Sequence, residues 1–179
     1  MEHLFSTVSC GSNGVCFLPY LVGERCPHRD SNTTGVFFGL TDQTTDLEMI
    51  RATIEGVTFG IRQSLEIMMD STILNEIVLI GGGSQSKLWC QMIADVCGSK
   101  VTVPIGSSVG PCFGAALCAL VGMKVKRDFS DIEPLWTQGR QFYPHEKDRE
   151  IYKNLFQFYA KLYPTLKPLF KKKKIGDSQ

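Results

Sequence analysis

The stretch Glu76-Ile-Val-Leu-Ile-Gly-Gly-Gly-Ser84, near the middle of the chain, decides the predicted fold. Its short apolar run predicts a buried strand, and its three glycines predict a tight turn where that strand ends. A helix is expected next, because apolar residues recur at helical spacing over 88–96 and Gly98 stands where a helix closes. Ser84 or Ser86 is the expected cap of this helix.

The same alternation of strand and helix continues on both sides of this stretch. Residues 36–40 form a β-prone run, and Thr45-Asp-Leu-Glu48 has the pattern of a capping box. Apolar residues then recur for about six helical turns, at Leu47, Ile50, Ile54, Val57, Ile61, Leu65 and Met68. A further strand over 101–103 and a small-residue helix over 113–121 complete the pattern. This order of elements indicates an α/β layer with a largely parallel sheet.

Four segments are expected along the chain. Residues 1–35 are closely punctuated by glycine and proline and predict an ordered loop leading into a domain. Residues 36–125 are the α/β domain, and 126–170 are a more polar C-terminal extension whose final helix runs towards Pro164. The last segment, 171–179, begins with four lysines and predicts a disordered basic tail.

Composition excludes several classes of protein. The net charge of +1 gives no field that points to nucleic acid or to an acidic membrane surface. No apolar run reaches the roughly 18 residues of a membrane span, and the first residues lack the pattern of a signal peptide. The seven cysteines are odd in number and form no C-x-x-C pair, so neither a disulfide framework nor a zinc site is expected. We expect free thiols and a cytoplasmic protein.

The glycine turn is the first candidate site. Glycine allows the backbone to approach a flat base or a phosphate, and helix N-termini offer amides to anions, so a strand-turn-helix of this kind suits a nucleotide. Tight packing without any ligand is the alternative explanation of the same glycines. A P-loop and a dinucleotide fingerprint are both absent from the sequence. Small residues at Gly110, Gly114, Ala115 and Ala116 allow the same two interpretations.

The second candidate site is the stretch Leu18-Pro-Tyr-Leu-Val-Gly-Glu-Arg-Cys-Pro-His28. Glu24 and Arg25 lie beside His28 in a loop bounded by glycine and proline. These polar groups could meet a polyhydroxylated substrate, or Glu24 and Arg25 could form a surface ion pair worth less than ~1 kcal/mol. The residues alone do not choose between the two.

Four stretches together resemble the FGGY family of carbohydrate kinases. Gly35-Val-Phe-Phe-Gly-Leu40, seven further residues and Glu48-Met-Ile-Arg-Ala-Thr-Ile-Glu55 look like the family's C-terminal signature. The stretch from Leu18 to His28 is similar to its "LPYLSGERTPH" segment, with Val22 and Cys26 as differences. Residues 81–95 resemble its adenosine-binding turn and helix, and residues 110–116 follow its "GxxxGAA" pattern. All four occur in the family's order and at its spacing.

The resemblance implies a fold and an activity. It implies a ribonuclease-H-like domain of the actin and hexokinase type, incomplete at its N-terminal side and followed by a C-terminal helical extension. Members transfer the γ-phosphoryl group of ATP, with Mg²⁺, to a sugar or polyol hydroxyl. By the resemblance, Gly81, Gly82 and Gly83 would pass against the adenosine and Ser86 would contact it. Glu24, Arg25 and His28 would belong to a loop on the substrate side. The Pro-His pair is most like members acting on D-xylulose, while gluconate and ribulose kinases stay open.

What the sequence lacks also bears on function. The family's Asp-x-Gly-Thr hairpin and its catalytic Gly-x-x-Asp-Gln segment have no counterpart, and the pair Asp42-Gln43 lies inside the C-terminal signature instead. We therefore expect no catalytic residue and no metal ligand in this chain, and an N-terminal kinase domain as its missing partner. Ser107 and Ser108 stand where the family often has glutamate. A non-catalytic module of the actin-like superfamily and an inactive truncated relic are the alternatives, and a homodimer stays open.

Overall fold

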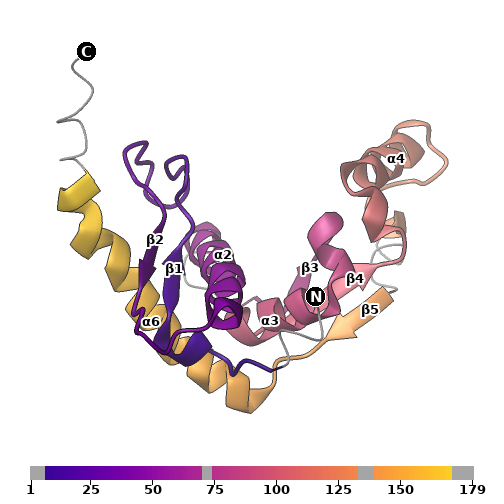
Figure 1. Cartoon of the computed structure of the whole chain (residues 1–179). Helices are drawn as coiled ribbons and strands as arrows, with labels where there is room; N and C mark the ends of the chain where they lie inside the picture. The colour runs from indigo at the N-terminus through magenta and orange to yellow at the C-terminus, as the bar shows by residue number, and fades with distance from the viewer. Residues whose placement is uncertain (1–6, 70–73, 133–138, 171–179) are drawn as a thin grey trace. The chain divides into compact units, whose positions relative to one another are not determined.

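The computed structural model describes residues 7–69, 74–132 and 139–170 of the 179-residue chain (Figure 1). The chain folds as two compact units. One contains Met1–Thr72 together with Glu146–Gln179, and the other contains Ile73–His145. The expected tail, 171–179, lies outside the described residues.

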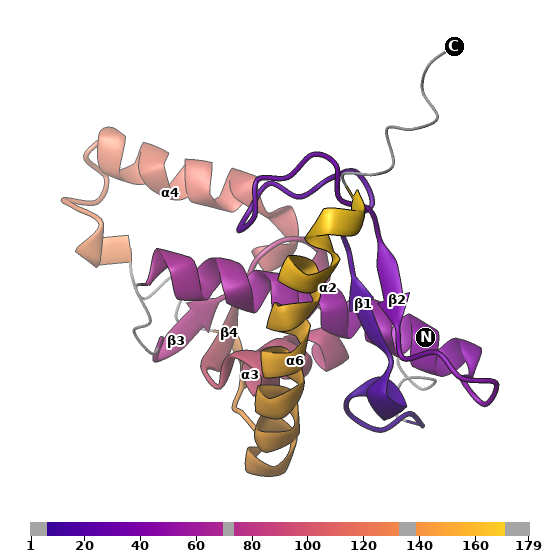
Figure 2. The same cartoon turned by 90° about the vertical axis from the view of Figure 1, so that its left-hand side faces the viewer.

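The first unit is built around a short antiparallel pair of strands. β1 (Cys16–Leu18) pairs with β2 (Val36–Phe38), with Phe17 opposite Phe37. Two long helices, α2 (Asp46–Met68) and α6 (Glu146–Phe170), pack against β1 (Figure 1, Figure 2). Aromatic rings fill the space between the helices, since Phe59 of α2 lies against Tyr152, Phe156 and Tyr159 of α6.

The helix α2 begins where the sequence predicts, but it buries a different face. Thr45 and Glu48 form the expected capping box. The face against β1 carries Gly56, where an added Cβ would lie 2.1 Å from the carbonyl oxygen of Phe17, so backbone meets backbone here. The buried residues of α2 are Glu48, Arg51, Ala52, Glu55, Gly56, Thr58 and Phe59. The apolar stripe predicted from the periodicity is only half-buried, and Ile50 and Met68 are 45% and 76% exposed.

The second unit is a three-stranded sheet in the order β3-β4-β5. β3 (Glu76–Val78) runs parallel to β4 (Lys100–Pro104), and β5 (Gly139–Phe142) runs antiparallel to β4. The helix α3 (Lys87–Cys97) covers one face, with Cys90, Ile93 and Ala94 packed against Val101 and Val103. The helix α4 (Pro111–Gly122) follows β4. The α/β class is confirmed, but the expectation of a largely parallel sheet is wrong, because two of the three described strand pairs are antiparallel.

Other sequence expectations also differ from the structure. Residues 1–35, expected to be loop, contain β1, whose three side chains are all buried. The last helix does not stop at Pro164 but continues through Pro164 and Pro168 to Phe170, held by buried Tyr163 and Phe170. It is also no appendage, because it packs on β1 and α2 within the first unit.

The expectations about cysteines and about membrane spans can both be compared with the structure. All seven cysteines are free thiols, and Cys16 and Cys90 are buried while Cys26, Cys112 and Cys118 are exposed. Among the described helices, none combines the length and the apolar character that a membrane span requires.

Candidate functional site

Two turns meet at the carboxyl ends of the parallel strands β3 and β4. The first contains the 3₁₀ turn Gly82–Gln85, and the second contains the 3₁₀ turn Ser107–Val109. The amide of Gly81 donates a 2.9 Å hydrogen bond to the carbonyl oxygen of Ser107, which joins the two turns. In open α/β sheets this end of parallel strands is where ligands bind.

The three glycines of the first turn differ in what surrounds them. Gly81 has φ 90°, a conformation that favours glycine, and a Cβ added to Gly83 would lie 2.4 Å from the ring of Trp89. Gly82 has neither constraint, because it is exposed and an added Cβ would meet no described atom within 4 Å. Packing therefore explains Gly83 and conformation explains Gly81. Of the three, only Gly82 is explained by neither conformation nor packing, and its bare backbone faces open space.

Three polar side chains, those of Ser84, Ser107 and Arg140, hold the two turns by hydrogen bonds, and the sequence interpretation missed all three roles. The hydroxyl of Ser84, which is fully buried, donates to the carbonyl oxygen of Gly81 at 2.7 Å and lies 3.3 Å from the hydroxyl of Ser107. Arg140 of β5 donates from Nη2 to the carbonyl oxygen of Ser84 at 2.7 Å. Ser107 thus has a structural partner, although it stands where the family often has glutamate.

Ser86, the fourth residue expected to meet the nucleotide, is also a helix cap. Its hydroxyl accepts a 3.2 Å hydrogen bond from the amide of Trp89, at the start of α3. Gly98, in a left-handed conformation, ends the same helix as expected. Ser86 therefore lies at the turn, but its side chain has a local role that needs no ligand.

The expected substrate-side loop lies in the other unit and is closed on itself. Backbone hydrogen bonds of 2.9 and 2.8 Å join Glu24 to Asp30, and the carboxylate of Glu24 accepts from the amide of His28 at 2.6 Å. No ion pair joins Glu24 to Arg25 among the described residues, so the surface-pair alternative is not what the structure shows. Arg25 is exposed.

His28 is held by aromatic rings. Its ring stacks on Tyr163 of α6 with centroids 3.7 Å apart, and the Tyr20 ring packs against it in a T-shaped arrangement with centroids 5.8 Å apart. The hydroxyl of Tyr163 donates to Asp30 at 2.9 Å and so ties the loop to α6. The Nε2 atom of His28 is buried without a hydrogen-bond partner in the described structure. Burial lowers the pKa of His28, against the opposing charge of Glu24, and so favours the neutral ring.

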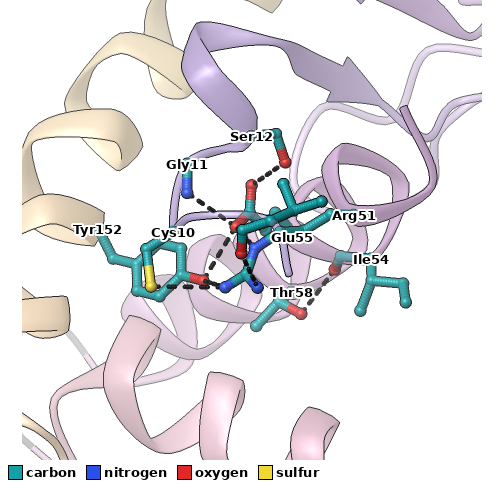
Figure 3. A network of polar contacts seen from close by, with 9 residues as sticks. Cys10, Gly11, Ser12, Arg51, Ile54, Glu55, Thr58 and Tyr152 are labelled. Carbon is teal, nitrogen blue, oxygen red and sulfur yellow. Dashed lines mark hydrogen bonds and ion pairs between the residues drawn. The ribbon is translucent and has the colours of Figure 1, made fainter. Parts of the chain in front are cut away.

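A second polar cluster in the same unit centres on Glu55 (Figure 3). Its Oε1 atom accepts from the Arg51 guanidinium at 2.8 Å, from the Tyr152 hydroxyl at 2.9 Å and from the Gly11 amide at 2.9 Å. Its Oε2 atom accepts from the Ser12 hydroxyl at 2.8 Å. The side chains of Arg51 and Glu55 are 9% and 3% exposed. Burial, with the charge of Glu55, raises the pKa of Tyr152, so this hydroxyl stays protonated as a donor.

This cluster fixes an unusual stretch of backbone. Gly11, Ser12 and Asn13 have consecutive positive φ values of 84°, 47° and 50°. Residues other than glycine rarely adopt this backbone conformation. Glu55 holds the first two of these residues, and Glu48 accepts from the side chain of Asn13. The two carboxylates of the expected C-terminal signature therefore hold the loop before β1. Nothing in their described contacts assigns them to a ligand.

The comparison with known families decides the kinship of this chain. The model of the FGGY family of carbohydrate kinases, C-terminal domain, matches residues 2–123. The chain belongs to the FGGY family. A xylulose kinase of Staphylococcus xylosus is 40% identical over 155 residues, which cover 86% of this chain and 32% of that enzyme. The chain thus spans about a third of the length of the curated relatives that it matches.

Solved structures of FGGY sugar kinases share the fold. A gluconate kinase from Lactobacillus acidophilus superimposes with a TM-score of 0.86 at 27% identity, and the match covers 95% of this chain and 35% of that one. A ligand-bound xylulose kinase from the same organism gives a TM-score of 0.84 at 27% identity, over 95% and 35% of the two chains. The expected actin- and hexokinase-type fold is confirmed.

Proposed function

We propose that this chain supplies the adenosine-binding part of an ATP-dependent sugar kinase. Gly82 carries the proposal, because it is the one glycine of the turn that neither conformation nor packing explains. Its exposed backbone, at the carboxyl ends of β3 and β4, offers a surface against which a flat base fits without a Cβ in the way. A chain of the FGGY family with such a turn is suited to hold ATP.

The residues of the two turns have different proposed roles in binding. Gly81, Gly82 and Gly83 would lie against the adenosine, and Ser84 and Ser107 would keep the two turns joined. Ser86 would contact the nucleotide as well, but it would contribute less to binding, since its hydroxyl already caps α3. Bound ATP supplies the phosphoryl group, and Mg²⁺ would offset the charge of its phosphates. We assign no metal ligand and no catalytic base to this chain.

The acceptor is proposed to be a sugar, with D-xylulose first. The xylulose kinases among the relatives support this choice, while the structural match to a gluconate kinase keeps a sugar acid as the alternative. On the substrate side, Arg25 is the exposed member of the expected trio, whereas Glu24 and His28 shape the loop around it. Phosphoryl transfer would need an N-terminal kinase domain as partner, and we place the protein in the cytoplasm.

A chimeric enzyme tests the function. This chain would replace the part of the Staphylococcus xylosus xylulose kinase that aligns with it, and sugar-dependent release of ADP would be measured. We expect the chimera to phosphorylate D-xylulose. The isolated chain should show no such turnover, because the loss of a positioned base alone typically removes a factor of about 10² to 10⁴. A folded chimera that binds sugar but does not bind ATP would contradict the proposal.

A further inference from the structure

Arg140 contacts the turn that carries Gly82, and no part of the proposed function assigns it a role. It comes from β5, where it stands opposite Val103 of β4. Its Nη2 atom donates to the carbonyl oxygen of Ser84 at 2.7 Å, and this is the only hydrogen bond that its side chain makes to a described residue. A strand distant in sequence thus reaches the glycine turn through one charged donor.

The carbonyl group of Ser84 is well placed to control the turn. It also accepts from the thiol of Cys90 at 3.3 Å, while the hydroxyl of Ser84 donates to the carbonyl oxygen of Gly81. Ser84 is therefore held through both its carbonyl group and its hydroxyl, and Gly82 lies between Gly81 and Ser84, the two residues that the hydroxyl joins. A hydrogen bond from a charged donor is roughly twice as strong as a neutral one, which makes Arg140 the strongest single restraint on Ser84.

The turn needs such a restraint because its own residues provide little. Three consecutive glycines lose more conformational freedom on ordering than any other residues would. Only Gly83 is limited by a neighbouring side chain, the ring of Trp89. A turn that is ordered before the ligand arrives binds more tightly, since the cost of ordering is not subtracted from the binding free energy.

We propose that Arg140 is a positioning residue that presets the Gly81 to Gln85 turn for the adenosine of a nucleotide. This inference rests on the proposed adenosine site. Arg140 acts through the carbonyl oxygen of Ser84 and does not itself touch the ligand. Its removal therefore weakens the binding of adenosine, ADP and ATP to the same extent.

The experiment compares three variants of the full chain with wild type. Arg140→Met keeps the aliphatic stem and removes the donors, and Arg140→Lys keeps one charged donor. Arg127→Met is the matched control in the same unit, since the side chain of Arg127 is 91% exposed and, among the described residues, forms an ion pair only with Asp131. Calorimetric titrations with adenosine, ADP and ATP would be run well below the melting temperature of each variant.

We expect Arg140→Met to bind all three ligands about tenfold more weakly, which corresponds to about 1.4 kcal/mol. Arg140→Lys should recover part of this loss, and Arg127→Met should bind as wild type does. Unchanged affinity in Arg140→Met would overturn the proposal. A loss that grows from adenosine to ATP would also overturn it, because it would show that Arg140 contacts the phosphates directly.

Amide hydrogen exchange gives a readout that needs no ligand. We expect the amides of residues 82–85 to exchange faster in Arg140→Met and Arg140→Lys than in wild type, with the amides of β4 unchanged. Equal exchange in this turn would contradict the positioning role. If folded wild-type chain binds no nucleotide, the adenosine site itself is refuted, and the exchange data still decide whether Arg140 orders the turn.

Discussion

Glu55 is the residue on which the buried hydrogen bonds of the first unit converge. Arginine, tyrosine, serine and a backbone amide all donate to its two oxygens (Figure 3). A buried carboxylate is costly unless its partners satisfy it, and here they do. The residue that ends the family signature thus serves the folding of the loop around Gly11.

Replacing Glu55 should therefore strongly destabilise the fold. Glu55→Ala leaves the Arg51 guanidinium buried without its counter-charge, and we expect the free energy of unfolding to fall by about 3–5 kcal/mol. Urea denaturation measures this directly. Glu66→Ala is the control on the same helix, because Glu66 is half-exposed in its pair with Arg62 and should cost less than about 1 kcal/mol. Equal costs for the two variants would show that the cluster around Glu55 is not a stabilising network.

His28 gives a pH-dependent prediction. Burial lowers its pKa in the folded chain, and Glu24, Asp30, Lys167 and the rings of Tyr20 and Tyr163 surround it. An unfolded histidine titrates near pH 6.5, so below that pH the unfolded chain binds more protons than the folded chain does. The free energy of unfolding must then decrease as the pH falls from about 6.5 towards the lowered pKa.

His28→Phe keeps a stacked ring and removes the titrating group. We expect wild type to lose stability relative to this variant below pH 6.5, and the difference to be constant above it. Unfolding curves in urea at several pH values between 5 and 8 provide the measurement. Parallel pH profiles for the two proteins would mean that His28 is not held in its neutral form.

At the scale of elements, α2 shows what periodicity predicts and what it misses. The capping box and the apolar repeat predicted the helix and its start correctly. They did not predict its buried face, because Gly56 brings α2 against the backbone of Phe17 and so turns polar residues inward. The side chains that satisfy those polar groups come from loops and from α6, far away in the sequence. No local pattern contains that information.

The corrected face makes a testable difference between two residues of α2. Phe59 is 3% exposed and lies against three aromatic rings of α6, so Phe59→Ala should cost about 3–5 kcal/mol. Ile54 belongs to the stripe that periodicity places in the core, but it is partly exposed. Ile54→Ala should therefore cost much less stability. Even Ile54→Asp should cost less stability than a carboxylate placed at a fully buried position would. Melting temperatures that fall equally for Phe59→Ala and Ile54→Ala would instead support the buried face of α2 that was predicted from the sequence.

The candidate nucleotide site was predictable in part. A strand followed by three glycines and a capped helix indicated the turn after β3, and the structure contains that strand, turn and helix. The strand is not buried as expected, because Val78 is 45% exposed. The sequence could not separate the three glycines, because packing against Trp89 and the open space at Gly82 are properties of the folded chain. It also gave no sign of Arg140, whose strand pairs with β4 only in the folded sheet. Nor did it give Ser107 a role, since this residue only marked a difference from the family's frequent glutamate, whereas in the structure its hydroxyl lies beside that of Ser84.

At the scale of the whole molecule, the chain divides into two units with different parts of the proposed function. The unit of β3, β4 and β5 carries the proposed adenosine turn, and the unit of β1, β2, α2 and α6 carries the proposed substrate-side loop. Each unit has a core of its own, around Ile93 and Val101 in one and around Phe17 and Ala52 in the other. Variants in one unit can therefore be judged against the stability of that unit.

The adenosine site at Gly82 is the central claim, and one paired measurement tests it. ATP affinity by calorimetry and melting temperature would be determined together for wild type, Gly82→Val and Gly83→Val, in this chain and in the chimeric kinase. Valine at Gly83 must displace Trp89, so we expect that variant to lose about 1–3 kcal/mol of stability. Valine at Gly82 meets open space, so we expect normal melting and no ATP binding. A Gly82→Val protein that melts normally and binds ATP as tightly as wild type would contradict the account.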